Sequence, residues 1–385
     1  MTTPAERAAL RAVADDFFRS GATEAATRAT MTTPQAVDER LWEQLGERGL
    51  GVLGVHVPES YGGAGQGFAD LAEVIAAAGA VLACVPLLSS AVLTTYALLC
   101  SGDSDACAQV LPAMIGGTSR GALAVHEDNA GWSLVPQATT AVRAGQHWRL
   151  SGTKAYVVDG GSAHLFLVSA LTGEGPGLFL VAPAADGVRR EAMPGLDLTR
   201  PLARVTFEET EARLVGQAGT ATRVLSEVMQ YASVAIAVEQ AAIAEHVLRG
   251  ATDYARTRIQ FGRAIGSFQA VKHKCADMAI AVETARAVAA HAVAAADGAG
   301  SLGTAAPLAK AYCSDALLAV AGANIQVHGG IGFTWEHSAH LYFKRAEADY
   351  LYLGDPVAHR RALAAELGLL PVSPAGMPHG SVPAG

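Results

Sequence analysis

Apolar residues recur three and four positions apart in two stretches of the first third of the chain, from Val37 to Leu50 and from Phe68 to Leu99. This period is that of one buried face of an α-helix, and it predicts an all-α domain over residues 1–121. Between the two stretches, residues 57–67 are dense in glycine. No Lys-Ser or Lys-Thr pair follows them and no strand-turn-helix unit surrounds them, so we interpret the segment as a tight turn between helices.

The pattern changes to short, β-rich or alternating runs over residues 122–217, and this predicts a small β domain. Long Ala-rich segments with the helical period return over residues 218–370, with glycines near their expected ends, and predict a helical bundle. Residues 371–385 are rich in Pro and Gly and are expected to form a disordered tail. The runs and glycines that carry these predictions are Trp148–Leu150, Ala155–Val158, Leu165–Val168, Leu178–Val181, Gly250, Gly298, Gly322 and Gly368.

Charge and composition exclude several classes of protein. The 385 residues include 28 Lys and Arg and 36 Asp and Glu, a net charge of −8, which argues against general nucleic-acid binding. Apolar runs end well before the ~20 residues that a bilayer requires, and the N-terminus lacks a basic region followed by an apolar one. We therefore expect a folded, cytoplasmic protein that does not enter a membrane.

The cysteines agree with a reducing compartment. There are 5 of them, an odd number, and they show no Cys-x-x-Cys spacing. We expect them to be reduced thiols, mostly in the core, and we predict no metal site.

Two segments of the last third combine basic or amide side chains with glycines at expected helix ends. The first runs from Arg256 to Lys272 and the second from Gln326 to Phe333. Unpaired backbone N–H groups and the helix dipole at such ends can hold a pyrophosphate. Taken singly, the first could be a plain turn between helices and the second a plain helix stop. Together and in this order they indicate half of a flavin-nucleotide site, and they resemble the acyl-CoA dehydrogenase family.

This resemblance extends from about Asp38 to Leu367. Residues 57–63, 86–90 and 151–154 are also similar in sequence to the family. The segment Gly329–His337 resembles that of an actinobacterial branch that acts on steroid or other bulky acyl thioesters. The resemblance implies an α+β fold with an N-terminal helical domain, a middle β-barrel domain and a C-terminal four-helix bundle. It also implies a tetramer with FAD between its subunits, and an electron-transfer flavoprotein as the electron acceptor.

By the same resemblance, six residues would bind the adenosine and pyrophosphate half of an FAD whose flavin sits in the neighbouring chain. They are Arg258, Phe261, Gln269, Gln326, Gly329 and Gly330. On the flavin side, the family carries a Thr-Glu pair and a Trp-Ile-Thr triplet. This chain has His126-Glu127 and Tyr156-Val157-Val158 there, and Val158 has no hydroxyl to offer flavin N5.

The expected chemistry removes the α-hydrogen of a thioester as a proton while the β-hydrogen leaves as hydride, and it requires a positioned carboxylate. The two positions at which the resemblance places this base hold Leu353 and Ala232. Asp355, two residues past the first position, and Glu239, seven residues past the second, are the candidate substitutes. Glu239 lies about 10 Å along a helix from Ala232. A structural or cofactor-side hydrogen bond is therefore its alternative role.

The adenosine-side residues are thus present, whereas the flavin-side and base residues are replaced. The leading hypothesis is a subunit of an FAD-dependent acyl-CoA dehydrogenase that shares its FAD site with a homologous partner chain in a heterotetramer. The alternatives are a self-sufficient homotetramer, a flavin-dependent monooxygenase on the same fold, and a catalytically silent assembly subunit. Acyl chain length, and CoA against a carrier protein as the thioester carrier, stay open.

Overall fold

Helices form the N-terminal part of the chain, and several of them begin at a side-chain cap. The computed structural model describes residues 2–46, 48–128, 130–182 and 185–370; the predicted disordered tail, 371–385, lies outside the described residues. Thr3, Thr23, Asp38 and Asp103 each accept a hydrogen bond from a backbone N–H of the first turn. The helices are α1 (Pro4–Gly21), α2 (Glu24–Thr30), α3 (Glu39–Leu45), η1 (Glu59–Tyr61), α4 (Phe68–Ala80), η2 (Leu87–Thr94), α5 (Thr95–Ser101) and α6 (Ser104–Ile115).

The apolar stretch from Val37 to Leu50 is helical only in its middle. Asp38 caps the start of α3, and the extended backbone of Gly46, with φ of −72° and ψ of −176°, ends it. The spacing of apolar residues therefore extends beyond both ends of the helix. The glycine-rich residues 57–67 connect α3 to α4 through the short η1, as a turn between helices.

The stretch from Phe68 to Leu99 is not one helix. It breaks after α4, where Leu82 adopts a left-handed φ of 51°, and helical structure resumes after Pro86 as the π-helix η2. The hydroxyls of Thr94 and Thr95 each donate to the carbonyl five residues earlier, so side chains reinforce the wider π turn. The turn at Leu82 and the proline at position 86 thus divide the predicted helical stretch, although the spacing of apolar residues continues through both.

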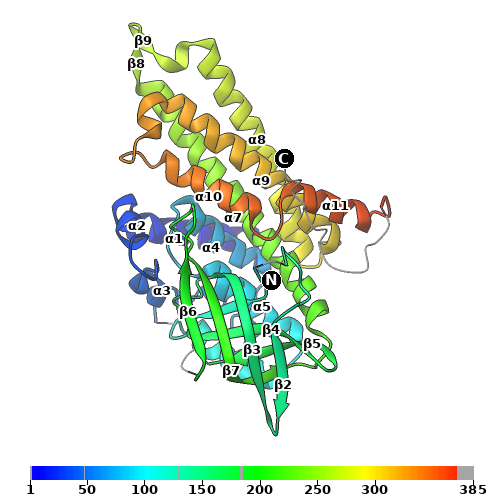
Figure 1. The fold of residues 1–385 in the computed structure, drawn as a ribbon. Coiled ribbons are helices and arrows are strands. Elements are labelled where there is room, and N and C mark those ends of the chain that lie inside the picture. Colours follow the sequence, from blue (N-terminus) through cyan, green and yellow to red (C-terminus); the bar gives the residue numbers. More distant parts are fainter. Residues whose placement is uncertain (1, 47, 129, 183–184, 371–385) are drawn as a thin grey trace, which may run out of the picture.

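Seven strands form a sheet that closes on itself. β2 pairs with β3, β3 with β7, β7 with β5, β5 with β4 and β4 with β2, while β1 lies beside β4 and β6 beside β7. This ring confirms the predicted middle β-barrel (Figure 1). The strands are β1 (Gly121–Ala124), β2 (Thr140–Ala144), β3 (His147–Val158), β4 (Leu165–Thr172), β5 (Gly175–Val181), β6 (Val188–Met193) and β7 (Leu202–Val215).

The C-terminal part is a bundle in which α7, α8, α9 and α10 pack against one another. Two of the expected helix ends were wrong: Gly250 lies inside α7 and Gly322 inside α9. A glycine within a helix costs only about 1 kcal/mol relative to alanine, which the packing of so long a helix outweighs. The elements are α7 (Ala221–Thr257), β8 (Ile259–Gln260), β9 (Arg263–Ala264), η3 (Ile265–Ser267), α8 (Gln269–Ala296), α9 (Leu302–His328), η4 (Gly329–Phe333), α10 (Ala339–Leu351) and α11 (Pro356–Glu366).

The barrel and the far end of the bundle lie at opposite ends of the molecule, with the N-terminal helices between them (Figure 1). α4 packs on α7, and one hydrophobic core runs through both helical parts. The barrel has a separate core that includes Phe166, Phe179 and Phe207. The junction of the three parts is therefore the place where side chains from all of them can meet.

Two helices, α8 and the segment Leu302–Phe333, are long and apolar enough to cross a membrane by length and composition alone. Both pack against α7 in the bundle, and core helices of soluble proteins pass the same test. The five cysteines are free thiols, and Cys84, Cys107 and Cys313 are buried.

Candidate active site

The first predicted cofactor segment forms a β-hairpin beyond α7. Arg258 ends α7, its N–H bonded to the Tyr254 carbonyl at 2.9 Å, and its side chain is exposed. Phe261 and Gly262 form the two-residue loop of the hairpin, with φ of 52° and 77°. Positive φ at both loop residues is the requirement of a type I′ turn. The turn leaves the Phe261 side chain 92% exposed, free to contact a ligand or another chain.

The second segment lies at the end of α9. Gln326 is in its last turn with an exposed side chain, and Gly329 ends the helix with a φ of 63° and an N–H bonded to the Gln326 carbonyl. Gly330 follows in η4 and is exposed. Gln269 is the exposed first residue of α8, where a helix leaves N–H groups unpaired and presents its positive end.

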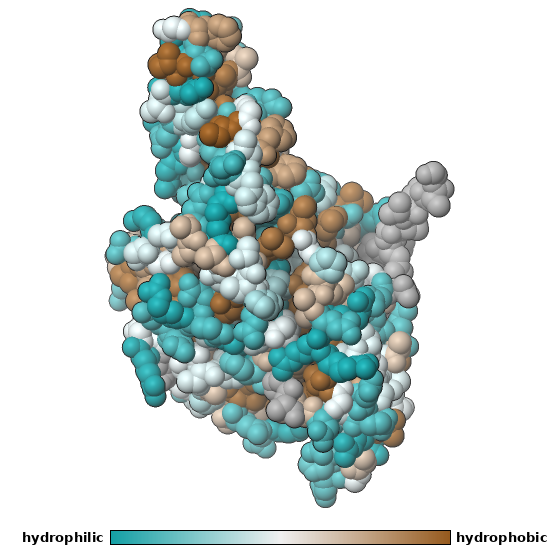
Figure 2. Space-filling model, turned by 60° about the vertical axis from the view of Figure 1, so that its left-hand side comes forward, coloured by the Kyte–Doolittle hydropathy of each residue, from teal (hydrophilic) through white to brown (hydrophobic). Residues whose placement is uncertain are grey.

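These helix ends all belong to the part of the bundle that points away from the barrel (Figure 1). Large apolar side chains are exposed beside them: Ile259 is 56%, Phe333 73% and Trp335 54% exposed. Figure 2 shows such apolar side chains on the projecting end of the bundle. Apolar area next to anion-binding groups is typical of a surface that a second chain covers.

Glu127, in the pair that the resemblance assigns to the flavin side, instead fixes a loop to the barrel. Its carboxylate accepts the backbone N–H groups of residues 137–139 at 2.9–3.0 Å and the Nζ of Lys154 at 2.9 Å. Burial alone would raise the pKa of Glu127, but these bonds and the charge of Lys154 outweigh it and lower the pKa to about 2. Burial in turn lowers the pKa of Lys154, which also donates to the Val125 carbonyl, to about 8.

An aromatic cluster joins the segments that the resemblance assigns to the flavin side and to the base. The indole of Trp132 meets His126 edge-on at 4.7 Å and Tyr352 edge-on at 5.3 Å, and lies 6.2 Å from Tyr156. Burial, and secondarily the charge of Lys154, lower the pKa of His126 to about 3, so its ring is neutral. Trp132 thus joins the three segments that contain His126, Tyr156 and Leu353, which were named from the sequence. Trp132 carried no periodic signal in the sequence and was missed.

The two usual base positions hold apolar side chains inside the core. Leu353 is 1% exposed and has a left-handed φ of 61°, and its carbonyl accepts a hydrogen bond from His359 at 3.1 Å. Ala232 is buried in α7. The candidate substitute Asp355 caps α11, its carboxylate accepting the Ala358 N–H at 2.8 Å. This geometry favours a structural role for Asp355, because its carboxylate faces the helix that it caps.

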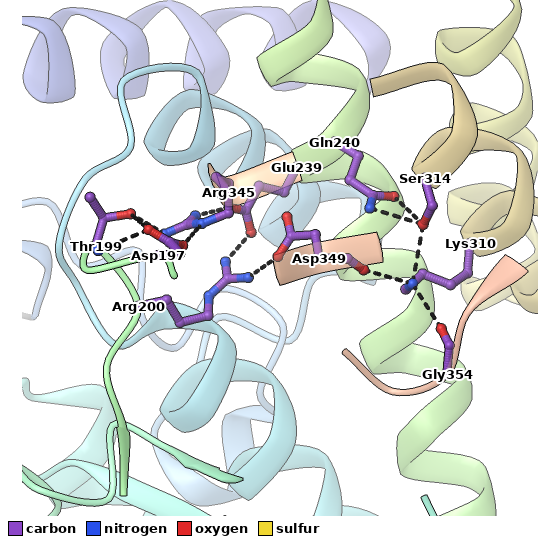
Figure 3. A network of polar contacts seen from close by, with 10 residues as sticks. All are labelled: Asp197, Thr199, Arg200, Glu239, Gln240, Lys310, Ser314, Arg345, Asp349 and Gly354. Carbon is purple, nitrogen blue, oxygen red and sulfur yellow. Dashed lines mark hydrogen bonds and ion pairs between the residues drawn. The ribbon is translucent and has the colours of Figure 1, made fainter. Parts of the chain in front are cut away.

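Glu239 lies at the centre of a buried network of ion pairs (Figure 3). One carboxylate oxygen pairs with Arg200 and the other with Arg345. Arg345 also pairs with Asp197 and donates to the Thr199 hydroxyl at 2.6 Å. Burial opposes ionisation of Glu239, but the two guanidinium groups outweigh it and lower its pKa. Because both oxygens are engaged, the geometry favours the structural role of Glu239 over that of a base.

Asp349 joins this network from α10. One of its oxygens pairs with Arg200, and the other has no hydrogen-bond partner among the described residues. Burial raises the pKa of Asp349 to about 7, an effect larger than the opposing charge of Arg200. Three carboxylates, those of Asp197, Glu239 and Asp349, therefore share two guanidinium groups. Sequence reasoning missed the network because residues 197–200 come from a barrel loop, which no periodic pattern connects to α7 or α10.

Lys310 fixes the loop between α10 and α11. It is fully buried in α9, and its Nζ donates to the Ser314 hydroxyl at 3.1 Å and to the carbonyls of Asp349 and Gly354 at 2.8 and 3.2 Å (Figure 3). These three bonds use all the N–H groups of the ammonium. The two carbonyls flank residues 350–353, so Lys310 sets the position of the apolar Leu353.

The space beside the network is small. A cavity of about 30 Å³ lies between Arg200, Glu239 and Arg345 on one side and α4 and η2 on the other. A Cβ at Gly79 would come within 2.6 Å of the Glu239 side chain, so α4 needs glycine there for the network to fit. The cavity has room for one or two water molecules and none for an acyl chain.

The residues that would hold FAD fit it on one side only. At the adenosine side, exposed arginine, amide and glycine groups at helix ends suit a pyrophosphate and an adenine. At the flavin side, Val158 is buried and has no hydroxyl, and the indole of Trp132 contacts both His126 and Tyr352. No group of three or more His, Cys, Asp or Glu side chains in the described part of the chain could hold a metal ion.

Comparison with known proteins extends the resemblance over nearly the whole chain. Residues 4–118 match the acyl-CoA dehydrogenase N-terminal domain and residues 219–368 the acyl-CoA dehydrogenase C-terminal domain. The acyl-CoA dehydrogenase IpdE2 of Mycobacterium tuberculosis is 36% identical over 95% of this chain and 99% of its own.

Solved structures agree. A chain of a variant of the Tcur3481-Tcur3483 steroid acyl-CoA dehydrogenase is 34% identical with a TM-score of 0.85 over 95% of this chain and 99% of its own. A chain of the ChsE4-ChsE5 complex of Mycobacterium tuberculosis is 30% identical with a TM-score of 0.87 over 97% and 99%. This chain therefore belongs to the acyl-CoA dehydrogenase family of FAD-dependent oxidoreductases that act on CH–CH bonds.

Proposed function

We propose that this chain is the non-catalytic partner in an acyl-CoA dehydrogenase heteromer. It lends its adenosine-binding surface to an FAD whose flavin, and whose catalytic carboxylate, belong to a homologous chain. The observation that carries the proposal is the contrast between its two half-sites. Arg258 and Gln326 at helix ends and Phe261 in a hairpin turn are exposed, whereas Trp132 contacts His126 and Tyr352 in the segments that the resemblance assigns to the flavin side and the base.

On the adenosine side, each of this chain's residues has a definite task. The Arg258 guanidinium would neutralise pyrophosphate charge, and the N–H groups at the start of α8 and near Gly329 would donate to phosphate oxygens. Phe261 would offer its exposed ring to the adenine. FAD, when bound, supplies the hydride acceptor for the β-hydrogen. This chain's contribution is to bind and orient the cofactor's far end.

The proton acceptor must come from elsewhere. Leu353 and Ala232 cannot accept a proton, Asp355 caps a helix, and Glu239 has both oxygens paired. The cavity beside Glu239 is also too small for an acyl chain. The absence of a free carboxylate at these positions supports a partner chain that provides the base.

The relatives support an expectation for that partner and substrate. The ChsE4-ChsE5 complex and the Tcur3481-Tcur3483 enzyme each consist of two named chains, and the second is called a steroid acyl-CoA dehydrogenase. We extend both properties to this chain: a homologous partner in a heterotetramer, and a steroid or similarly bulky acyl thioester as substrate. An electron-transfer flavoprotein in the cytoplasm would accept the electrons.

The deciding experiment measures flavin absorbance and acyl-CoA dehydrogenase activity of this chain alone and of the complex with a homologous chain encoded beside it. We expect a colourless lone protein, and a yellow complex that dehydrogenates an acyl-CoA in the presence of an artificial electron acceptor. Replacing the base of the partner should abolish activity while flavin stays bound. Replacing Asp355 by Asn in this chain should leave activity intact.

Other outcomes would point to the alternatives. A yellow, active protein without partner would establish a self-sufficient homotetramer. Turnover that needs oxygen and reduced flavin but no thioester would establish a monooxygenase. A complex that remains colourless with excess FAD would leave this chain an assembly subunit.

A further inference from the structure

A second cavity lies in the bundle, away from the aromatic cluster and the ion-pair network. It has a volume of about 410 Å³ and is open to solvent. α10 packs against both α7 and α9 at this place, where the three helices run side by side (Figure 1). The lining residues used below are His246, Gly250, Asp253, Tyr254, Asn324, His328, His337 and Tyr342.

Gly250 keeps the floor of this cavity open. It lies inside α7, where glycine is less favourable than alanine. A Cβ built at Gly250 would meet no atom within 4 Å, so close packing does not explain the glycine. The space that its missing side chain leaves belongs to the cavity.

The cavity contains a buried hydrogen-bond acceptor that has no partner. Asn324 is 4% exposed, and its Oδ1 has no partner among the described residues. His328 Nδ1 lies 2.9 Å from the backbone carbonyl of Asn324, which can only accept, so the neutral form of the ring would donate from Nδ1 and leave Nε2 as an acceptor. A buried acceptor without a partner is costly, and a ligand with N–H groups would satisfy it.

Charge and aromatic faces favour the same class of ligand. Asp253 is the one formally charged residue among those that line the cavity in the described chain, and its pairing with the exposed Arg256 lies outside the lining, at 3.6 Å. Burial lowers the pKa of His246 and of His337, so both rings tend to be neutral. Tyr254 stacks on His328 at 4.3 Å, and Tyr342 lies 5.2 Å from His246. Such rings attract organic cations.

We propose that this cavity is a binding site for a small organic cation with N–H donors, such as an amine or amidine, on a flat or short carbon skeleton. Asn324 Oδ1 and His328 Nε2 would accept its hydrogen bonds, and Asp253 would balance its charge. The site borders the cofactor surface, since Thr257 and His328 line it and directly precede Arg258 and Gly329, but Gln326 is two residues from Asn324 and leaves the opposite side of α9. It is independent of the proposed division of the FAD site.

The test uses benzamidine as the cationic probe and benzoate as its anionic counterpart, measured by isothermal titration calorimetry on the purified chain and on its complex. We expect benzamidine to bind with one site per chain and benzoate not to bind. Gly250→Leu should fill the cavity and weaken benzamidine binding at least tenfold, and Asn324→Leu should weaken it by a similar factor. Gly322→Ala, a change at another glycine inside a helix, should leave binding unchanged.

The proposal fails if benzoate binds as well as benzamidine, or if Gly250→Leu leaves the affinity unchanged. It also fails if no heat of binding is found with either probe. Thermal melting of each variant checks the fold, and Gly250→Leu is expected to melt no lower than the unaltered chain, because leucine favours a helix more than glycine does. Flavin content is read separately, so a failure here leaves the proposed function untouched.

Discussion

The indole of Trp132 meets the ring of Tyr352 edge-on, with centroids 5.3 Å apart. Tyr352 directly precedes Leu353, the residue at one of the two positions where the family carries its base. The pair joins a loop of the barrel domain to the loop between α10 and α11, the two segments to which the resemblance assigns the flavin side and the base. We expect contacts within this chain to occupy that region in place of a flavin.

Replacing Trp132 by Ala tests this occupancy. We expect a loss of about 2–3 kcal/mol in the free energy of unfolding, less than the 3–5 kcal/mol typical of a fully buried tryptophan, because Trp132 is only partly buried. The flavin content of the complex should not change. Trp148→Ala, at a partly buried tryptophan that packs on Phe179 in the barrel, is the matched control. Loss of flavin from a folded Trp132→Ala complex would instead place the flavin in this chain.

Arg258→Ala tests the adenosine side. Removing a charged hydrogen-bond donor to pyrophosphate should cost about 1.5–3 kcal/mol of binding, or roughly 10- to 100-fold in FAD affinity of the complex. Because Arg258 is exposed, the melting temperature of the chain without FAD should stay the same. Arg256→Ala removes a neighbouring exposed arginine that pairs with Asp253, and should leave FAD affinity unchanged. Equal losses of FAD affinity in both variants would indicate a general attraction of FAD to positive charge rather than a specific pyrophosphate site at Arg258.

The sequence predicted the order of helical, barrel and bundle parts because each has its own apolar period and the resemblance covers most of the chain. It could not predict where long helices continue through a glycine, as at Gly250 and Gly322, because packing by distant residues decides that. The break after α4 was hidden for a related reason. Leu82 turns the chain there in a conformation that leucine seldom adopts.

The residues of the candidate site show the same difference between what local sequence predicts and what the tertiary fold decides. Local motifs located Arg258, Phe261 and Gly329 because turn and cap geometry depends on near neighbours. The role of Glu239 depends on Arg200 and Arg345, which lie 39 and 106 residues away. Proximity of that kind follows from the tertiary fold, so the sequence could offer Glu239 as a carboxylate but could not show that both its oxygens are paired.

Glu239→Gln distinguishes a structural carboxylate from a catalytic one. Removing the charge leaves two buried guanidinium groups short of a partner, and we expect a loss of about 3–5 kcal/mol in the free energy of unfolding. Glu245→Gln, on the same helix but in a partly exposed pair with Arg249, should cost no more than about 1 kcal/mol. Denaturant unfolding of both variants measures the difference. Normal stability with lost activity in Glu239→Gln would restore it as a base.

Asp349→Asn tests the excess carboxylate through pH. Burial raises the pKa of Asp349 from 3.8 to about 7, so the folded chain holds this proton more tightly than the unfolded chain does. The resulting stability is complete below pH 4 and is lost as the pH rises from about 4 to about 7. Across that window, the unaltered chain should lose stability relative to Asp349→Asn by on the order of 1 kcal/mol per pH unit.

The comparison isolates Asp349 because other titrating groups are common to both proteins. His126, whose pKa burial lowers to about 3, and Glu127, whose pKa falls to about 2 beside Lys154, contribute equally to each curve. Urea unfolding of both proteins from pH 4 to pH 8 supplies the two curves. Parallel curves would mean that Asp349 is ionised throughout, and that the charge of Arg200 outweighs burial at the junction of the three parts. Curves that separate as the pH rises would show that the network holds a proton.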